Sequence, residues 1–289
     1  MKEFCDLHAH STESDGTFTP SEIIGEAKRI GLAYVALTDH DTIAGIEEAL
    51  CAADKLGVNL ITGIELTIDV ANLNIDLEDD SSIHILGYLN HKNIFKMSRY
   101  EKRLLTIRNE RNAKMFEKAK KIGLPISEEY FKSKSPKSII TRGHFLRALL
   151  ENGFAKERKE AFAKYLMPGG SLCVEKEKLS PEEVLSLISE NGGVAVLAHP
   201  LLSSLTDPNL ETLVVSLKAR GLKGLEAVYV ENQRGDEQKV KELAARHDLI
   251  ITGGSDFHGD TKPGIFLGTG YGDLRVPKVL AERVLELMT

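Results

Sequence analysis

The sequence has few cysteines and no long apolar run. Its three cysteines, Cys5, Cys51 and Cys173, are odd in number and scattered among 289 residues, so a disulfide framework is not expected and a reducing cytoplasm is the predicted location. No run approaches the roughly 20 apolar residues that a membrane-spanning helix needs. The charged start leads directly into a strand-like run, without the pattern of a signal peptide. These absences argue against a membrane protein and a disulfide-stabilised secreted domain.

The charge of the chain is unevenly distributed. The whole chain carries −6, but residues 96–147 hold fifteen Lys or Arg against five Glu and no Asp, a balance of +10 that leaves −16 for the rest. Such asymmetry indicates that this segment faces an anionic ligand. A solvated, lysine-rich helix face is the alternative that the charges alone leave open.

Short apolar runs alternate with amphipathic helical stretches through most of the chain. Runs of this length, rich in Val, Ile and Leu and bounded by Gly or polar residues, are typical of buried parallel strands. Seven runs have this character: Phe4–His8, Ala33–Thr38, Leu60–Glu65, Ile83–Leu89, Val194–Ala198, Gly224–Tyr229 and Leu249–Thr252. Their alternation with helices favours a barrel-like α/β fold. An open doubly wound sheet is the competing architecture, although no Gly-rich phosphate loop follows any run.

Helix signals stand between the runs. Thr19-Pro20-Ser21-Glu22 combines an N-cap, a proline at the first helical position and a capping-box glutamate, and residues 180–183 repeat this pattern. Gly31 and Gly57 are expected to end two early helices.

The alternation breaks in the middle of the chain, where only helices are predicted. They cover Arg99–Ile122, Arg142–Glu151 and Lys156–Leu166. We therefore expect residues 98–179 to form an inserted, basic, helical substrate-binding subdomain. Residues 1–97 and 180–289 would together form the catalytic barrel.

Three potential metal ligands, His8, His10 and Asp15, stand close together near the start of the chain. Side chains two apart in a strand share a face, so the two imidazoles point the same way and can chelate a divalent ion. Asp15 follows in a tight turn with Gly16, near enough to add an oxygen. By itself this cluster is weak evidence for a metal site.

The placement of the other candidate ligands strengthens that interpretation. Six of the nine histidines stand in or shortly after predicted strands, together with Glu65 and Asp256. In parallel α/β barrels the carboxyl ends of the strands meet at one mouth, where active sites form. For His84, inside an apolar run, a buried core histidine is the alternative. As a set we predict a metal site formed by His8, His10, Asp15, His40, Glu65, His84, His199, Asp256 and His258.

Six motifs together resemble those of the polymerase and histidinol phosphatase (PHP) family. In chain order they are DLHAHSTESDG, ALTDHD, GIEL, IHILGY, LAHP and GGSDFHG. The segments RNERNAKM, TRGHFLRALLENGF and EAFAKYLMPGG resemble the helical part of bacterial nucleoside 3′,5′-bisphosphate phosphatases and their 5′-to-3′ exoribonuclease relatives. The resemblance implies a distorted barrel of seven β/α units with a helical insertion, and a metal-dependent phosphoric ester hydrolase.

The resemblance also implies two to three divalent ions and divides the ligands among them. The implied sets are His8, His10, Glu65 and Asp256 for one ion; Glu65, as a bridge, with His84 and His199 for a second; and Asp15, His40 and His258 for a third. Imidazole suits zinc and iron, and carboxylates also admit manganese, so the identity of the ions stays open.

For this site we predict hydrolysis of a phosphate ester by attack of a metal-bridging hydroxide. Paired ions about 3.5–4 Å apart neutralise phosphate oxygens and generate hydroxide near neutral pH, so no catalytic residue apart from the ligands is required. The predicted substrate is a small phosphorylated molecule, either a nucleotide (a 3′,5′-bisphosphate or AMP) or the 5′ end of short RNA. Neither a membrane nor DNA is expected as a partner.

Four basic residues of the insertion are predicted to bind a substrate phosphate that is not cleaved: Arg108, Arg111, Arg142 and His144. Arg108 and Arg111 share a face of one predicted helix, and Arg142 and His144 open another. The guanidinium fork suits phosphate oxygens. The alternatives are surface charges for the arginines and a helix cap for His144.

Other functions are compatible with some of the same residues. A histidinol phosphate phosphatase, or another small-molecule phosphatase, keeps the chemistry, but the basic insertion favours ligands with more than one phosphate. A non-catalytic or polymerase-associated module is opposed by the complete set of ligands. Hydrolysis of a carbon–nitrogen bond by a similar metal site is the remaining alternative.

Overall fold

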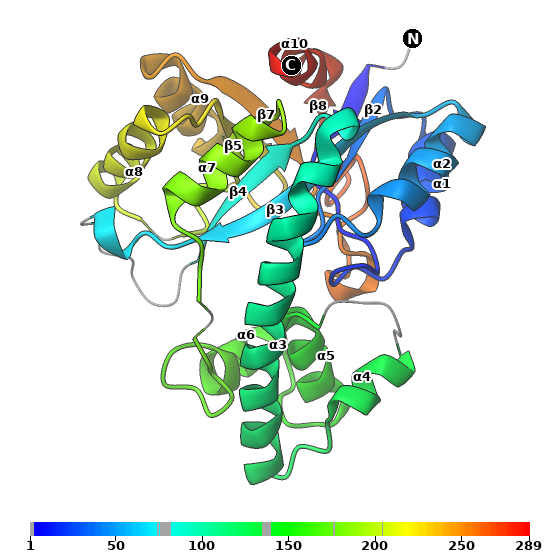
Figure 1. Cartoon of the computed structure of the whole chain (residues 1–289), viewed down its shortest axis with the longest axis vertical. Coiled ribbons are helices and arrows are strands. Elements are labelled where there is room, and N and C mark those ends of the chain that lie inside the picture. The colour runs from blue at the N-terminus through cyan, green and yellow to red at the C-terminus, as the bar shows by residue number, and fades with distance from the viewer. Residues whose placement is uncertain (1–2, 74, 76–81, 135–139, 176, 204) are drawn as a thin grey trace.

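A computed structural model describes residues 3–73, 75, 82–134, 140–175, 177–203 and 205–289. A barrel surrounded by helices forms its upper part, and helices from the middle of the chain lie below it (Figure 1). The long helix α3 (Ser98–Lys121) runs from the barrel into this lower group. None of the described helices combines the length and apolar character needed to cross a membrane.

Within the described part of the chain, eight strands form one sheet. They are β1 (Phe4–Asp6), β2 (Tyr34–Leu37), β3 (Asn59–Ile68), β4 (Ile83–Tyr88), β5 (Val194–Leu197), β6 (Gly224–Tyr229), β7 (Ile250–Gly254) and β8 (Val276–Pro277). Their order in the sheet is β7-β6-β5-β4-β3-β2-β1-β8. The two ends meet where the N–H of Leu7 donates to the carbonyl of Gly253 at 3.1 Å, and that of His10 to Phe257 at 2.8 Å. The predicted α/β barrel is confirmed, with one short additional strand.

The expectation that all strands are parallel is wrong for β4. This strand pairs antiparallel with both β3 and β5, and β8 is antiparallel to β1. A parallel connection normally needs a crossover helix, but the described residues between β3 and β4 include only the turn η1 (Ala71–Leu73). An apolar run carries no signal of its direction, so the pattern could not reveal the reversal.

Six described helices surround the barrel: α1 (Pro20–Ile30), α2 (Ile46–Leu56), α7 (Pro181–Glu190), α8 (Asp207–Ala219), α9 (Asp236–Arg246) and α10 (Lys278–Leu287). The predicted capping boxes begin α1 at Thr19 and α7 at Ser180. An N-cap of this kind contributes about 1 kcal/mol. Gly31 and Gly57 end α1 and α2 in the left-handed conformation, as expected.

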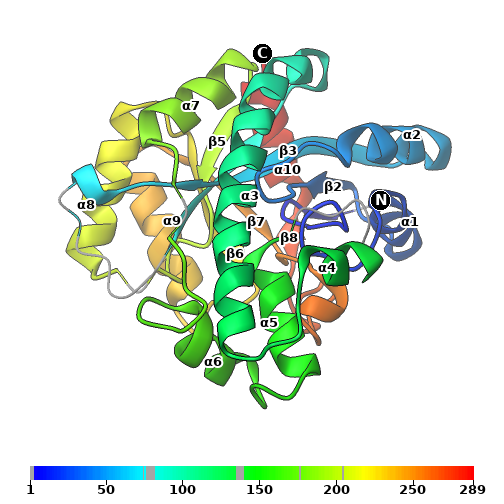
Figure 2. The ribbon, with the colours of Figure 1, turned by 60° about the horizontal axis from the view of Figure 1, so that its bottom comes forward.

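Only helices lie between β4 and β5 among the described residues. They are η2 (His91–Met97), α3, α4 (Glu128–Lys134), α5 (Arg142–Glu151), α6 (Arg158–Ala161) and the π-helical turn η3 (Phe162–Leu166). Figure 2 brings this end forward and shows α4, α5 and α6 beside α3. The prediction was correct for α5 and within one residue for α3. The helix predicted over 156–166 is divided into α6 and η3, and α4 was not predicted.

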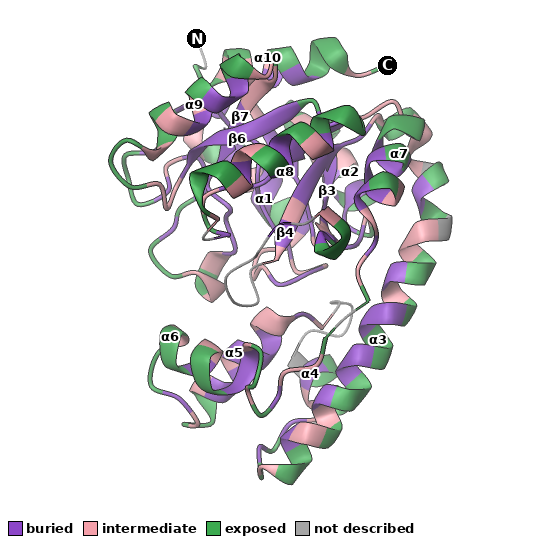
Figure 3. Cartoon of the chain, turned by 90° about the vertical axis from the view of Figure 1, so that its left-hand side faces the viewer, coloured by how far each residue is buried: buried purple, intermediate pink, exposed green. Residues whose placement is uncertain are grey.

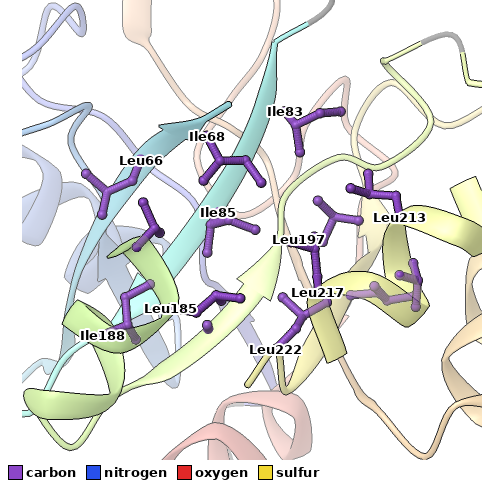
Figure 4. Close-up of a cluster of buried hydrophobic side chains, with 14 of the residues drawn as sticks. Leu66, Ile68, Ile83, Ile85, Leu185, Ile188, Leu197, Leu213, Leu217 and Leu222 are labelled. Atoms are coloured by element: carbon purple, nitrogen blue, oxygen red, sulfur yellow. The ribbon is translucent and has the colours of Figure 1, made fainter. Parts of the chain in front are cut away.

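Helix α3 contributes to two separate hydrophobic clusters. Its first half adds Leu104 to the barrel cluster, in which β3, β4 and β5 pack against α7 and α8 (Figure 4). Its second half adds Met115 and Ala119 to a cluster within the insertion, with Phe145 of α5 at its centre. Buried and exposed residues accordingly alternate along α3 (Figure 3). Each fully buried Leu or Phe contributes about 1.5–3 kcal/mol, so both clusters hold this helix in place.

Candidate metal centre

The structure brings together all nine side chains that the sequence indicated as ligands. Strand β4 is antiparallel to its neighbours β3 and β5 and starts where they end, so it delivers His84 to the same end of the barrel. The nine residues form four overlapping groups, and within each group the potential ligand atoms lie within 4.8 Å of one another. The groups are His10, Asp15, His40 and His258; His8, His10 and Asp256; His8, Glu65 and His199; and His40, Glu65 and His84.

Glu65 lies between the other candidate ligands, and each of its two carboxylate oxygens is close to two histidines. Its Oε1 is 2.8 Å from Nδ1 of His84 and 3.0 Å from Nε2 of His199. Its Oε2 is 3.0 Å from Nδ1 of His40 and 3.2 Å from Nε2 of His10. A carboxylate with ligand atoms around each oxygen can bridge two cations.

Asp15 and Asp256 supply the other two carboxylates. Oδ1 of Asp15 lies 3.3 Å from Nε2 of His258 and 4.0 Å from Nε2 of His40. Oδ1 of Asp256 lies 3.3 Å from both Nε2 of His10 and Nδ1 of His258. The negative charges are thus spread over the pocket and separated by imidazoles.

Three residues at the pocket have an unusual backbone. His199, Asp256 and Asp41, which follows His40, have φ values of 28°, 50° and 56°. A positive φ is uncommon for residues other than glycine and costs on the order of 1–3 kcal/mol. His199 and Asp256 thereby present candidate ligand atoms to the pocket, whereas Asp41 pairs with Arg108.

Glu226 of β6 was not among the predicted site residues. This fully buried carboxylate places Oε1 3.0 Å from Nδ1 of His8 and accepts the N–H of His199 on Oε2 at 2.8 Å. A carboxylate on one ring nitrogen fixes the tautomer of a histidine, so that Nε2 of His8 faces the pocket as a lone-pair donor. The signal was present in the sequence, because Glu226 is the single charged residue of its apolar run.

Two further residues missed from the sequence hold Asp256. The hydroxyl of Tyr229 donates to its Oδ2 at 2.9 Å, and Lys262 forms an ion pair with the same oxygen. Oδ1 remains directed at the histidines. Lys262 lies in a polar turn without a recognisable motif, so the sequence offered no signal for it.

Burial and neighbouring charges set the protonation of the pocket. Burial opposes ionisation of the carboxylates, but His40 and His84 hold the pKa of Glu65 well below its usual range, and His258 and His40 do the same for Asp15. Burial lowers the pKa of His84 and His258 to about 4. Against the opposing effect of burial, Glu226, Asp256 and Glu65 raise the pKa of His8, and hydrogen bonds to Asp256 and Glu65 raise the pKa of His10 to about 9. A cation that binds at neutral pH would therefore displace protons from these two imidazoles.

Several polar atoms of the pocket are available to bind divalent cations. Buried atoms without a hydrogen-bond partner among the described residues include Nε2 of His8, both ring nitrogens of His10, Oδ1 of Asp15 and Oε2 of Glu65. An unsatisfied buried polar atom costs about 1–3 kcal/mol. A cation between these atoms would satisfy them together, and zinc, iron and manganese all accept this combination of nitrogen and oxygen ligands.

Three arginines of the insertion lie near one another beside the pocket. Arg108 forms a buried ion pair with Asp41. Arg111 is also buried, and its Nη2 lies 3.5 Å from the carbonyl of Ile140. Burial, together with the positive charges of Arg108 and Arg142, lowers the pKa of Arg111. The segment therefore concentrates positive charge at the edge of the metal pocket.

His144 caps α5, the role that the sequence left as its alternative. The backbone N–H of Thr141, the N-cap, donates to Nδ1 of His144 at 3.2 Å. Burial lowers the pKa of His144 to about 4. Because Nδ1 is an acceptor, the neutral ring carries its proton on Nε2, which can donate to a ligand.

A barrel mouth that gathers nitrogen and oxygen ligands in this way is typical of metal-dependent hydrolases. The model of the PHP domain family matches residues 6–171, and the chain belongs to this family. His199, Asp256 and His258 lie beyond the matched residues but fold into the same pocket.

Known relatives narrow the chemistry to phosphate esters. A 5′-3′ exoribonuclease of Haemophilus influenzae is 34% identical over 89% of this chain and 91% of its own length. A 3′,5′-nucleoside bisphosphate phosphatase of Chromobacterium violaceum is 31% identical over 91% and 90%. A crystal structure from Bifidobacterium adolescentis, assigned as a metal-dependent phosphoesterase, matches with a TM-score of 0.83 at 29% identity, over 99% of this chain and 96% of that one. The chain is therefore a metal-dependent phosphoesterase.

Proposed function

We propose that the enzyme hydrolyses a phosphate ester of a nucleotide, a 3′,5′-bisphosphate or AMP, or acts at the 5′ end of short RNA. Relatives named as a nucleoside bisphosphate phosphatase and a 5′-3′ exoribonuclease support this substrate class. In this proposal residues 98–179 are the substrate-binding unit, and residues 1–97 with 180–289 are the catalytic barrel.

The observation that carries the proposal is the environment of Arg111. Its side chain is 5% exposed, and its Nε has no hydrogen-bond partner among the described residues. Its charged neighbours are Arg108 and Arg142, which carry the same sign, and Asp41, whose carboxylate already pairs with Arg108. A buried guanidinium in such surroundings is unfavourable unless an anion binds. A phosphate that is not being cleaved would supply that anion, while a second phosphate occupies the metal pocket.

The four basic residues would divide the binding of this phosphate among them. Arg111 and Arg142 would contact its oxygens, with support from the first turn of α5, where backbone N–H groups attract anions. Arg108 would act through its ion pair with Asp41, which holds α3 against the barrel. His144 would donate from Nε2.

The nine ligands would hold two to three divalent ions, manganese, zinc or iron. The proposed sets are His8, His10, Glu65 and Asp256; Glu65, His84 and His199; and Asp15, His40 and His258. The two oxygens of Glu65, each with its own histidines, support a bridging role. When bound, such ions neutralise phosphate oxygens and lower the pKa of water.

Residues of the chain would set both the geometry and the negative charge of this site. Asp15, Glu65 and Asp256 would set its negative charge, and the histidines would fix its geometry without adding to that charge. Glu226 would hold the ring of His8, and Tyr229 would hold Asp256. Hydrolysis would need no nucleophile from the protein and no covalent intermediate.

The substrate is tested with the purified chain in manganese. Adenosine 3′,5′-bisphosphate, AMP, histidinol phosphate and a short 5′-phosphorylated RNA are offered, and phosphate and nucleoside products are resolved. We expect a nucleotide or the RNA to have the highest kcat/KM. Faster turnover of histidinol phosphate would replace the proposal with the small-molecule phosphatase. Bound metal without turnover of any substrate would point to a binding module.

Removal of a phosphate-binding arginine should affect only substrates with a second phosphate. Arg111→Ala or Arg142→Ala should raise KM for a bisphosphate by about 10- to 100-fold, because a hydrogen bond to a charged group contributes about 1.5–3 kcal/mol. KM for a simple aryl phosphate should change little. Arg103→Ala is the matched control, since Arg103 lies on the same helix but pairs with Glu183 on the surface. Equal effects on both substrates would contradict the assigned role.

A further inference from the structure

We propose that Thr141 is a positioning residue for a cation site formed by Asp15, His40 and His258. Docking of the insertion on the barrel and cation binding at this site would then stabilise each other. The inference rests on the proposed assignment of these three ligands to one ion.

The first turn of α5 lies directly on Asp15. The hydroxyl of Thr141 donates to Oδ2 of Asp15 at 3.0 Å, and both residues are buried. The same hydroxyl accepts the N–H of Gly143 at 3.1 Å, so it joins the helix cap to the carboxylate. A Cβ at Gly143 would lie 2.9 Å from Oδ2, so a larger residue would displace this carboxylate oxygen. With Oδ2 held, Oδ1 of Asp15 faces His258 and His40.

The loop that carries His40 is also bonded to the insertion. Asp41, the next residue, forms the buried ion pair with Arg108 of α3. Two turns earlier on α3, Oε1 of Glu101 accepts the hydroxyl of Thr42 at 2.8 Å and the N–H of Ile43 at 3.1 Å. Three consecutive residues after His40 thus depend on α3 for their position.

The turn that carries His258 is held in the same way. Arg158 of α6 donates to the carbonyl of Thr261, three residues after His258. The hydroxyl of Thr261 in turn donates to the carbonyl of Asp15 at 2.9 Å. Every ligand of this set is therefore either contacted by the insertion or lies within three residues of a contact.

The other ligands are held from within the barrel. Glu226 of β6 fixes both His8 and the backbone of His199. Glu65 and His84 lie in the paired strands β3 and β4. Loss of a contact from the insertion should therefore weaken one cation site and spare the rest.

The test measures cation binding rather than hydrolysis. Equilibrium dialysis against Mn²⁺, with the metal counted by mass spectrometry, is applied to the full chain and to Thr141→Val, which removes the hydroxyl donor at similar shape. Partners in this position typically contribute about 10- to 100-fold to metal affinity. We expect one ion of Thr141→Val to lose affinity by about this factor while the others bind as before, and Thr141→Ser to restore it.

Two more variants separate the contact from general effects on folding. Thr206→Val removes the N-cap hydroxyl of α8, far from the proposed site in sequence, and should leave all Mn²⁺ affinities unchanged. Gly143→Ala keeps the cap but crowds Oδ2 of Asp15, and should reproduce the selective loss. Mn²⁺ should also give the insertion less protection from limited proteolysis in Thr141→Val than in the wild type. The reason is that cation binding and docking of the insertion stabilise each other reciprocally.

The inference fails if Thr141→Val binds every ion with wild-type affinity, or if all sites weaken equally. It also fails if the wild-type chain binds only those ions that Thr141→Val binds equally well. A wild-type chain that binds ions in the expected pattern but hydrolyses no nucleotide would remove the proposed function and leave this inference in place.

Discussion

The ligands of the pocket depend on residues that are not ligands themselves. Glu226 fixes His8 through Nδ1, and Tyr229 with Lys262 holds one oxygen of Asp256. In each case a neighbour occupies one side of the ligand and leaves the other side directed at the pocket. The geometry of the metal centre is therefore set by this outer layer as much as by the nine ligands.

Glu226→Gln should weaken cation binding with little effect on folding. An amide has nearly the same shape as the carboxylate, but it lacks the charge that stabilises a histidine bound to a cation. The expected loss is about 10- to 100-fold in affinity for the ion at His8. Mn²⁺ titration of the purified variant measures it, and circular dichroism checks the fold.

A surface pair of the same chemistry serves as the control for Glu226. Oε1 of Glu211 lies 2.9 Å from Nε2 of His247, and the Glu211 side chain is 44% exposed. Glu211→Gln should leave Mn²⁺ affinity unchanged. Equal Mn²⁺ binding by Glu226→Gln and the wild type would mean that the ring of His8 is held by its other surroundings.

Single-residue patterns predicted ligands better than their supports. Apart from Asp15, which stands in a turn, each candidate ligand is a His, Asp or Glu within or shortly after a recognisable apolar run, so position and chemistry coincide in the sequence. Lys262 has no such marker, because its role arises only where the turn after β7 meets Asp256. The assignment of individual ligands to ions remains a prediction.

At the scale of elements, the barrel mouth depends on the close approach of β7 and β1. A Cβ at Gly254 would lie 2.4 Å from Cβ of His8 and 2.7 Å from its backbone nitrogen. Neither atom belongs to the flexible end of a side chain, so the strands would have to separate. Glycine is required here because two backbones meet beside a ligand.

Gly254→Ala should therefore lower both stability and cation affinity. Overpacking of this kind costs about 1–3 kcal/mol, and urea unfolding with and without Mn²⁺ measures the two effects. Gly25→Ala in α1 is the matched control. A Cβ there meets nothing within 4 Å, and alanine favours a helix over glycine by about 0.5–1 kcal/mol, so this variant should be slightly stabilised. A neutral Gly254→Ala would show that β1 and β7 can separate freely.

Helices were predicted more accurately than strand directions. Capping boxes at Thr19 and Ser180 are local signals that act within one turn, and they began their helices as expected. The direction of β4 depends on how the chain returns after β3, which no residue within the strand encodes. Helix α4 was missed because its seven residues, EEYFKSK, are too few for a clear apolar stripe.

For the whole molecule, the metal centre connects distant parts of the chain. Its candidate ligands extend from His8 to His258, and helices α3, α5 and α6 contact three of the loops that carry them. A cation that binds only the folded chain stabilises it by mass action. Stability and metal occupancy are therefore linked.

Chelation should lower the melting temperature, and Mn²⁺ should restore it. At a free Mn²⁺ concentration of 100 times Kd, one site adds about 2.7 kcal/mol to the free energy of unfolding, which corresponds to a shift of several degrees. Thermal unfolding in EDTA and in excess Mn²⁺ measures this difference. Potassium at equal ionic strength is the control. An unchanged melting temperature would mean that the pocket does not hold cations under these conditions.

The sequence by itself determined the alternation of strands and helices, the caps and the identity of the nine candidate ligands. These features follow from hydrophobic periodicity, backbone conformation and side-chain chemistry, which act over a few residues. The tertiary structure alone decided the direction of β4, the partner of Arg108 and the contact between Thr141 and Asp15. Such relations join residues far apart in the chain, and they exist only after packing has brought those residues together.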